Sequence, residues 1–76
     1  MDFIIRDILR AWKEDAKVTH LMQYSLRNKV LTVYTDRPGP LIGRMGERVD
    51  RFKQRLLKET FGQVAEVRLE ETRGIV

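Results

Sequence analysis

Two glycines three positions apart, with a basic residue between them, are the part of this chain best suited to binding chemistry. The segment reads Leu41-Ile42-Gly43-Arg44-Met45-Gly46, and Arg37-Pro38-Gly39-Pro40 precedes it. Glycine has no Cβ, so a loop here lets a ligand approach the backbone N–H groups closely. A helix that begins after Gly46 would add the free N–H groups of its first turn. A sugar-phosphate backbone fits such a loop, and nucleic acid is therefore the first partner to consider.

The positive charge of the chain is concentrated around this loop. The 76 residues carry a formal net charge of +4. Residues 27–58 hold nine basic and three acidic side chains, whereas residues 1–26 are balanced and residues 59–76 are acidic overall. Clustering of this kind is typical of a protein that binds a polyanion. The alternative interpretation is an ordinary solvated helix face in a mildly basic protein.

Five of the basic residues recur at helical spacing. Separated by 4, 3, 4 and 3 positions, they are Arg44, Arg48, Arg51, Arg55 and Lys58. If the helix is continuous near Gly46, they form one basic stripe that could follow the phosphates of a bound strand. The competing interpretation is helix solvation, with Glu47 and Arg51 paired four residues apart.

No pattern of residues indicates catalysis or metal binding. His20 is the only histidine and has no acidic or nucleophilic pattern beside it, the chain has no cysteine, and Asp36 and Asp50 lack metal-ligand spacing. We therefore expect no enzyme, no catalytic residue, no metal and no cofactor. The early charges and the lack of a long apolar run favour a cytoplasmic protein without a membrane segment.

Hydrophobic periodicity predicts a helix followed by a hairpin. Residues 2–16 place apolar side chains, Trp12 among them, on one face of a helix. Residues 18–26 and 29–36 alternate as strands, and a two-residue turn at Arg27-Asn28 joins them. The expected pairs are Leu26–Lys29, Tyr24–Leu31 and Met22–Val33. This register puts the apolar residues of both strands on one face.

The second half of the chain predicts a helical crossover and a third strand. A short helix begins at Pro40, and a longer one spans about 47–60 with Val49, Phe52 and Leu56 in its buried stripe. Gly62 supplies a left-handed end to this helix, and residues 64–70 form a strand. A right-handed crossover makes the last two strands parallel. The order helix, strand, strand, helix, helix, strand gives a two-layer α+β fold, with helices on one face of a three-stranded mixed sheet.

This pattern resembles a type II KH domain. The shared features are a strand, Arg-Pro-Gly, two apolar positions, Gly-x-x-Gly, a helix and a strand, over residues 30–69, and the leading helix and strand also match. The likeness is greatest to the KH domain of the bacterial small-subunit ribosomal protein uS3. It implies a single type II KH domain over residues 1–76, with a core at about 2–71 and a loose tail at about 72–76.

The resemblance implies that single-stranded RNA, about four nucleotides of it, lies across the Gly-x-x-Gly loop. Its bases would enter a groove between the paired helices and the last strand. Gly43 and Gly46 would allow close approach, Arg44 would contact phosphate, and Leu41 and Ile42 would lie near an apolar floor. The full set of expected contact residues is Arg37, Leu41, Ile42, Gly43, Arg44, Met45, Gly46, Arg48, Arg51 and Lys53.

The expected function is binding of single-stranded RNA with little sequence preference, as in an RNA chaperone or a ribosome-associated factor. One groove that reads about four bases makes few discriminating contacts. A homodimer, a protein partner or several copies on one RNA would then strengthen the binding. The alternative is a KH-fold protein-interaction module without RNA binding, motivated by Met45 in place of a polar loop residue and by the acidic last strand. Single-stranded DNA is a further candidate ligand.

Overall fold

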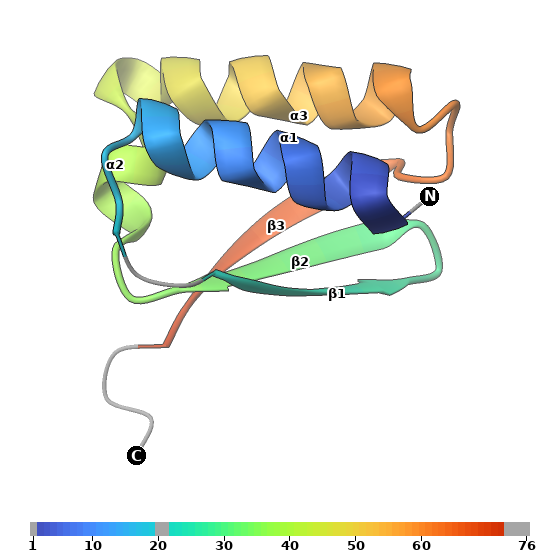
Figure 1. The fold of residues 1–76 in the computed structure, drawn as a ribbon, viewed down its shortest axis with the longest axis horizontal. Coiled ribbons are helices and arrows are strands. Elements are labelled where there is room, and N and C mark those ends of the chain that lie inside the picture. The colour runs from blue at the N-terminus through green and yellow to red at the C-terminus, as the bar shows by residue number, and fades with distance from the viewer. Residues whose placement is uncertain (1, 20–21, 73–76) are drawn as a thin grey trace.

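The computed structural model describes residues 2–19 and 22–72, which form a layer of helices over a sheet (Figure 1). The elements in chain order are α1 (Asp2–Asp15), β1 (Gln23–Arg27), β2 (Val30–Thr35), α2 (Pro38–Ile42), a 3-10 turn (Arg44–Gly46), α3 (Glu47–Glu59) and β3 (Glu66–Glu71). The order of elements, and hence the α+β fold expected from the sequence, is confirmed. In the part of the chain that the structure describes, no helix is long and apolar enough to cross a membrane.

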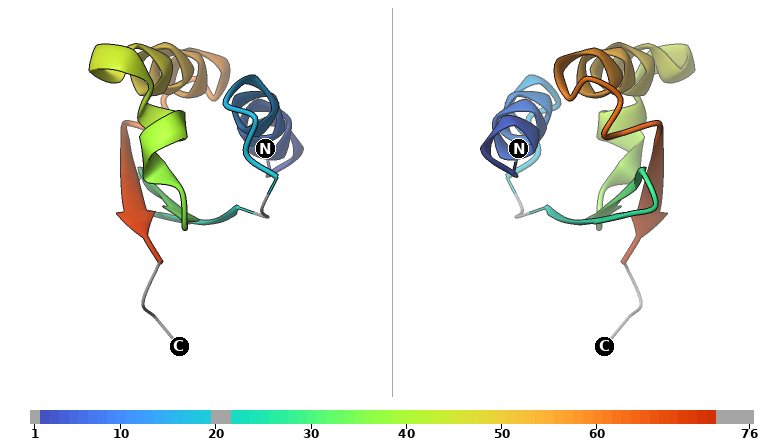
Figure 2. Two further views of the ribbon diagram at one scale, coloured as in Figure 1. Left: turned by 90° about the vertical axis from the view of Figure 1, so that its left-hand side faces the viewer. Right: turned by 90° about the vertical axis from the view of Figure 1, so that its right-hand side faces the viewer.

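The sheet has its three strands in the order β1-β2-β3. β1 is antiparallel to β2 and β3 is parallel to β2, so the sheet is mixed, as predicted. The end-on views in Figure 2 show the helices on one face of this sheet, with α1 beside α3. The chain therefore has the two-layer type II KH fold, and the crossover from β2 to β3 contains α2, the glycine loop and α3.

Trp12 joins the three helices at the centre of the core. Its side chain is fully buried, and its ring stacks on Phe52 with the centroids 5.6 Å apart and the planes 8° from parallel. The indole Nε1–H donates to the Leu41 carbonyl oxygen at 2.9 Å, so its polar group is satisfied inside the core. Trp12 lies on the apolar face of the first helix, as predicted, and its contacts fix α1 to both helices that flank the glycine loop.

The first strand begins later than the alternation predicts. Lys17 has a positive φ of 57°, and the Val18 N–H donates to the Lys13 carbonyl oxygen at 3.0 Å. This left-handed cap ends α1 and uses the Val18 N–H. Val18 and Thr19 consequently precede β1, which begins at Gln23. Residues 20–21 of the predicted strand, with His20, lie outside the described residues.

The hairpin turn lies at Asn28-Lys29, one residue later than predicted. Both residues have positive φ, 53° and 65°, as the two central positions of a type I′ turn require. The register is therefore Leu26 with Leu31 and Tyr24 with Val33, together with Gln23–Tyr34, Ser25–Thr32 and Arg27–Val30. Each residue of β1 pairs two positions further along β2 than predicted, and because side chains alternate, the apolar face is kept.

Two other elements begin at different residues from those predicted. α2 begins at Pro38 rather than Pro40, because N–H groups in the first turn of a helix have no intrahelical partner and both prolines can be accommodated there. β3 begins at Glu66 rather than at residue 64. The Val64 N–H donates to the Thr60 hydroxyl oxygen at 3.1 Å, so the chain is still tied to the end of α3 at that point.

The predicted long helix is confirmed, with two changes in detail. Phe52 and Leu56 are buried as expected, but Val49 is only partly buried. At the carboxyl end of α3, Phe61 (φ 53°) precedes Gly62 (φ 86°) in the left-handed region. Gly62 therefore has the predicted backbone conformation, although a phenylalanine takes the first left-handed position.

Candidate nucleic-acid interface

The glycine loop connects α2 to α3 at one end of the molecule (Figure 1). Gly43 has φ 77° and ψ −178°, a backbone region open essentially to glycine alone. A Cβ built at Gly43 would lie 2.8 Å from the Arg48 Cβ and 3.1 Å from the Arg48 backbone nitrogen. Both the backbone conformation and the close approach therefore require glycine, and they fix the loop against the first turn of α3.

The tip of the loop faces solvent. Met45 and Gly46 are both left-handed, with φ of 55° and 76°, and two such residues interrupt the helix. Met45 is 95% exposed. Arg44 is exposed, and its guanidinium makes no hydrogen bond or ion pair with another described residue. The interruption also means that Arg44 is not part of a continuous basic stripe on α3.

Arg48 packs against the glycine loop and connects it to neighbouring helices. Its Nε donates to Asp15 Oδ2 at 2.8 Å, and one terminal nitrogen donates to the Pro40 carbonyl oxygen at 2.6 Å. Arg48 therefore links the end of α1 to α2, and its own backbone packs against Gly43. Only 30% of its side chain is exposed. Of the basic residues expected to contact nucleic acid, Arg48 is thus the one most engaged in internal contacts.

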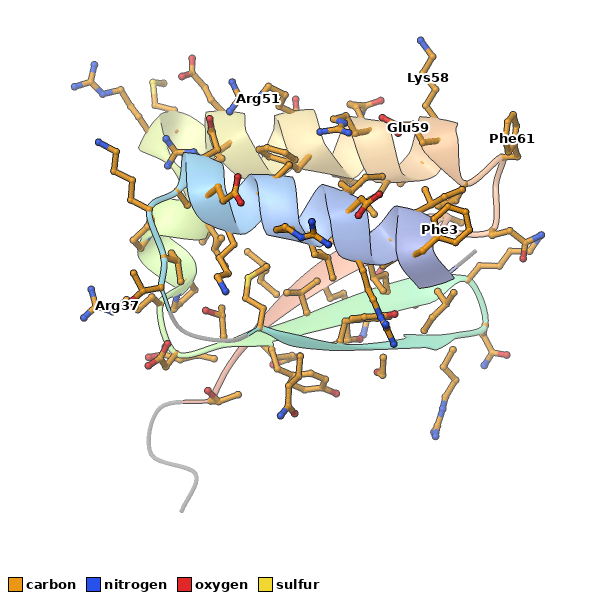
Figure 3. All side chains as sticks on the ribbon, in the orientation of Figure 1. Phe3, Arg37, Arg51, Lys58, Glu59 and Phe61 are labelled. Atoms are coloured by element: carbon orange, nitrogen blue, oxygen red, sulfur yellow. The ribbon has the colours of Figure 1, made fainter. Side chains whose placement is uncertain are left out.

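Ion pairs occupy most of the remaining basic stripe. Arg51 donates to Asp15 Oδ2 at 2.5 Å, and Arg55 donates to Glu59 at 2.9 Å. Lys58 points away from α3 at the end opposite to the loop (Figure 3). The hydrogen bond from Arg48, aided by the charges of both arginines, holds the pKa of Asp15 below its ordinary value. The spacing on α3 suggested an ion pair between Arg51 and Glu47. Among the described residues, Arg51 instead pairs with Asp15.

A groove of about 420 Å³ opens beside the loop, between α3 and β3. The loop contributes Met45 and Gly46, and two half-buried valines, Val49 on α3 and Val67 on β3, supply apolar surface. The charged residues of the lining are Glu47, Asp50 and Lys53. The groove can thus pack a flat apolar group between a helix and a strand, but two of the three charges at its rim are negative.

The other expected contact residues lie in different surroundings. Leu41 is fully buried in the core, so it supports the loop without facing a ligand, whereas Ile42 is 39% exposed. Arg37 points outward from the start of α2 (Figure 3) and lines a separate depression with Pro38 and Glu71. The structure therefore brings Met45, Gly46 and Lys53 together at the groove and places Arg37 apart from them.

Sequence reasoning missed Asp15 and the acidic part of the groove. Asp15 meets Arg48 and Arg51 across 33 and 36 positions of the chain, and no local spacing indicates such a pairing. Glu47 and Asp50 fall in the first turn of α3, where acidic residues are usual because they complement the helix dipole. Their place beside Val67 becomes visible only when β3 is docked. Among the described residues no cluster of His, Cys, Asp or Glu could hold a metal ion.

Curated relatives match nearly all of this chain, and the three described here are each named small ribosomal subunit protein uS3. The protein from Laribacter hongkongensis (strain HLHK9) is 33% identical over 73 residues, which are 95% of this chain and 31% of the relative. The one from Psychrobacter sp. (strain PRwf-1) is 34% identical over 71 residues, 92% of this chain and 28% of the relative. The one from Paracidovorax citrulli (strain AAC00-1) is 34% identical over 73 residues, which are 95% of this chain and 25% of the relative.

The chain thus spans less than a third of the length of these relatives. No protein-family model and no solved structure matches it. The order of elements, the mixed sheet and the Gly43-to-Gly46 loop between α2 and α3 are the features on which the resemblance rests. The chain has the type II KH fold, and it resembles the bacterial ribosomal protein uS3, which contains a domain of this kind.

Proposed function

We propose that this domain binds single-stranded RNA across the Gly43–Gly46 loop, with bases in the groove between α3 and β3. The observation that carries the proposal is the loop itself. It exposes Arg44 and Met45 at its tip and opens directly onto the groove that Val49 and Val67 line. The relatives are components of the small ribosomal subunit, a particle built on RNA, which supports the same ligand class.

Each part of the loop and groove has a separate role in this proposal. Gly43 and Gly46 let the sugar-phosphate backbone approach, and Arg44 pairs with a phosphate. Lys53 at the rim of the groove supplies a second cation, and the two valines pack against a base. About four nucleotides fit such a site, so sequence preference is low. This suits an RNA chaperone or a ribosome-associated factor that gains strength from a second copy or a partner protein.

The decisive experiment replaces both residues at the tip, Arg44→Asp with Met45→Asp, and measures binding of a labelled single-stranded RNA of about eight nucleotides, twice the length that one KH loop clamps. We expect binding to be abolished, because two carboxylates would face the phosphates. The fold should persist, since neither side chain is buried. The wild-type salt dependence should have a slope of about −1.4 in log K against log salt if Arg44 and Lys53 each neutralise one phosphate.

A matched control comes from the other end of α3. Lys58→Asp with Phe61→Asp changes the charge by the same three units, also at exposed positions. In Figure 3 both side chains point to solvent, far from α2. We expect this control to retain most of the affinity. Equal losses in the two double variants would indicate general electrostatic attraction, and an intact affinity in the loop variant would refute the proposed site.

The acidic residues of the groove favour one competing function. Glu47 and Asp50 line the groove and would repel the phosphates of a nucleic acid that lay over the groove and not over the loop. The same two carboxylates could pair with a basic segment of a partner protein. Under that interaction-module hypothesis, the wild-type domain binds no single-stranded RNA even at low salt. A DNA oligonucleotide of the same sequence, measured in parallel, shows whether the ligand's 2′-hydroxyls contribute to binding.

A further inference from the structure

Two arginines of α3 converge on a single carboxylate oxygen at the end of α1. Arg48 Nε and a terminal nitrogen of Arg51 lie 2.8 Å and 2.5 Å from Asp15 Oδ2. A phosphate oxygen is an acceptor of the same kind and carries more charge, and arginine pairs are a common phosphate-binding arrangement. Asp15 thus sits where an anion from outside the domain could be held.

The two guanidinium groups are kept in place by contacts other than the one with Asp15. Arg48 also donates to the Pro40 carbonyl oxygen at 2.6 Å, and the guanidinium of Arg51 lies 5.2 Å from the centroid of the Phe52 ring. These contacts would remain if the carboxylate moved away. The position is therefore preorganised for an anion and would not have to be assembled by the ligand.

The position is also open to solvent and close to the loop. The side chains of Asp15 and Arg51 are 43% and 60% exposed. Arg48 packs directly against Gly43, the first glycine of the loop. A strand that crosses the loop at Arg44 and continues toward α1 would bring its next phosphates over this pair.

We propose that Arg48 and Arg51 form a second phosphate-binding position, which Asp15 fills as an internal substitute for phosphate. This inference rests on the proposed function, because the phosphate belongs to an RNA strand already held at the loop. Asp15 then lowers the affinity of the domain and reduces its salt dependence. Binding by the free domain relies on the loop, and the arginine pair joins only when a phosphate displaces the carboxylate.

Asp15→Asn tests this directly, because it removes the charge and preserves the shape. The salt slope of RNA binding should steepen by about 0.7 for one added phosphate contact, or about 1.4 for two. The ratio of variant to wild-type affinity should then grow by about 2.6-fold or 7-fold, respectively, as salt falls from about 200 to 50 mM. Adding Arg51→Gln to Asp15→Asn should reverse part of the change in slope.

The matched control is Glu14→Gln, which makes the same change of charge one residue earlier on α1. Glu14 is exposed, and its carboxylate makes no hydrogen bond or ion pair with another described residue. It should raise the affinity slightly and leave the slope unchanged. If Asp15→Asn has the same slope as Glu14→Gln, or binds more weakly while remaining folded by circular dichroism, the inference is overturned and Asp15 is a structural residue only.

A second measurement keeps this inference separate from the proposed function. Inorganic phosphate is titrated into Asp15→Asn and wild type, and the side-chain Nε–H resonances of Arg48 and Arg51 are followed by NMR. Saturable shifts of both resonances in the variant, weaker in wild type, support the second position even if no RNA binds. Absence of such shifts in the variant contradicts it, even if the loop binds RNA.

Discussion

The two glycines of the loop should differ sharply in their tolerance of alanine. Gly46 has φ 76° and ψ 12°, and a Cβ built there meets nothing within 4 Å. Gly43 has φ 77° and ψ −178°, and its Cβ would collide with Arg48. Alanine at Gly46 therefore tests the cost of a left-handed backbone alone. Alanine at Gly43 tests the cost of an unfavourable backbone together with a steric clash.

The expected magnitudes follow from these two geometries. Alanine in the left-handed region costs about 1–2 kcal/mol, partly offset by about 0.4–1 kcal/mol from the stiffer unfolded chain, so Gly46→Ala should lose about 1 kcal/mol. At Gly43 the backbone region itself costs about 1–3 kcal/mol, and displacing the Arg48 backbone adds about 1–3 kcal/mol. Gly43→Ala should therefore lose about 3 kcal/mol, a large part of the about 4–11 kcal/mol typical of a domain this size.

Thermal unfolding followed by circular dichroism measures the difference. Each kcal/mol shifts the melting temperature of a domain this small by about 4–8 °C, so Gly43→Ala should melt about 8–16 °C below Gly46→Ala. Gly46→Asn should be milder still, since asparagine tolerates the left-handed region. Equal melting temperatures for the two alanine variants would refute both the assigned φ/ψ of Gly43 and its close packing on Arg48.

Two further outcomes concern the core and the ion pairs. Phe52→Asp should leave the chain unfolded, because it buries an unpaired charge against Trp12 in a domain with little stability to spare, and a cooperative melt of this variant would contradict the packing of α3. Asp15 should stabilise the fold in a pH-dependent way, because the hydrogen bond from Arg48 is the main cause that lowers its pKa in the folded state. The stabilisation is fully present above the unfolded-state pKa of about 3.9. It is lost as the pH falls through the lower pKa of the folded state. The difference in melting temperature between wild type and Asp15→Asn should accordingly be constant above about pH 5 and decrease as the pH is lowered further, and a difference that grew on acidification would contradict this assignment.

Local signals in the sequence determined the elements, and long-range contacts determined what the loop residues do. The spacing of Gly43 and Gly46 located the loop, and the periodicity around Phe52 and Leu56 located α3, because both signals depend only on near neighbours. The turn was misplaced since only Asn28 is a common positive-φ residue, and nothing in the chain indicates that Lys29 shares that conformation.

The same limit applies to the basic stripe on α3. Regular spacing predicts one continuous row of cations, but the left-handed Met45 separates Arg44 from it, and Asp15 pairs with two of the others from a distant part of the chain. No pattern of neighbouring residues indicates either the left-handed conformation of Met45 or the pairing of the arginines with Asp15. The charge of the segment was therefore predictable, whereas the share of it available to a ligand was not.

The parallel pairing of β2 with β3 also affects how the domain forms. The β1–β2 hairpin joins neighbouring residues through a two-residue turn and can close within about 1–10 μs. The partners in the β2–β3 pairing are separated in the sequence by the whole crossover, and contacts this far apart form slowly. The groove needs Val67 from β3, so we expect it to be completed late in folding. During synthesis, a nascent chain that already displays the glycine loop would still lack one wall of the groove until β3 leaves the ribosome.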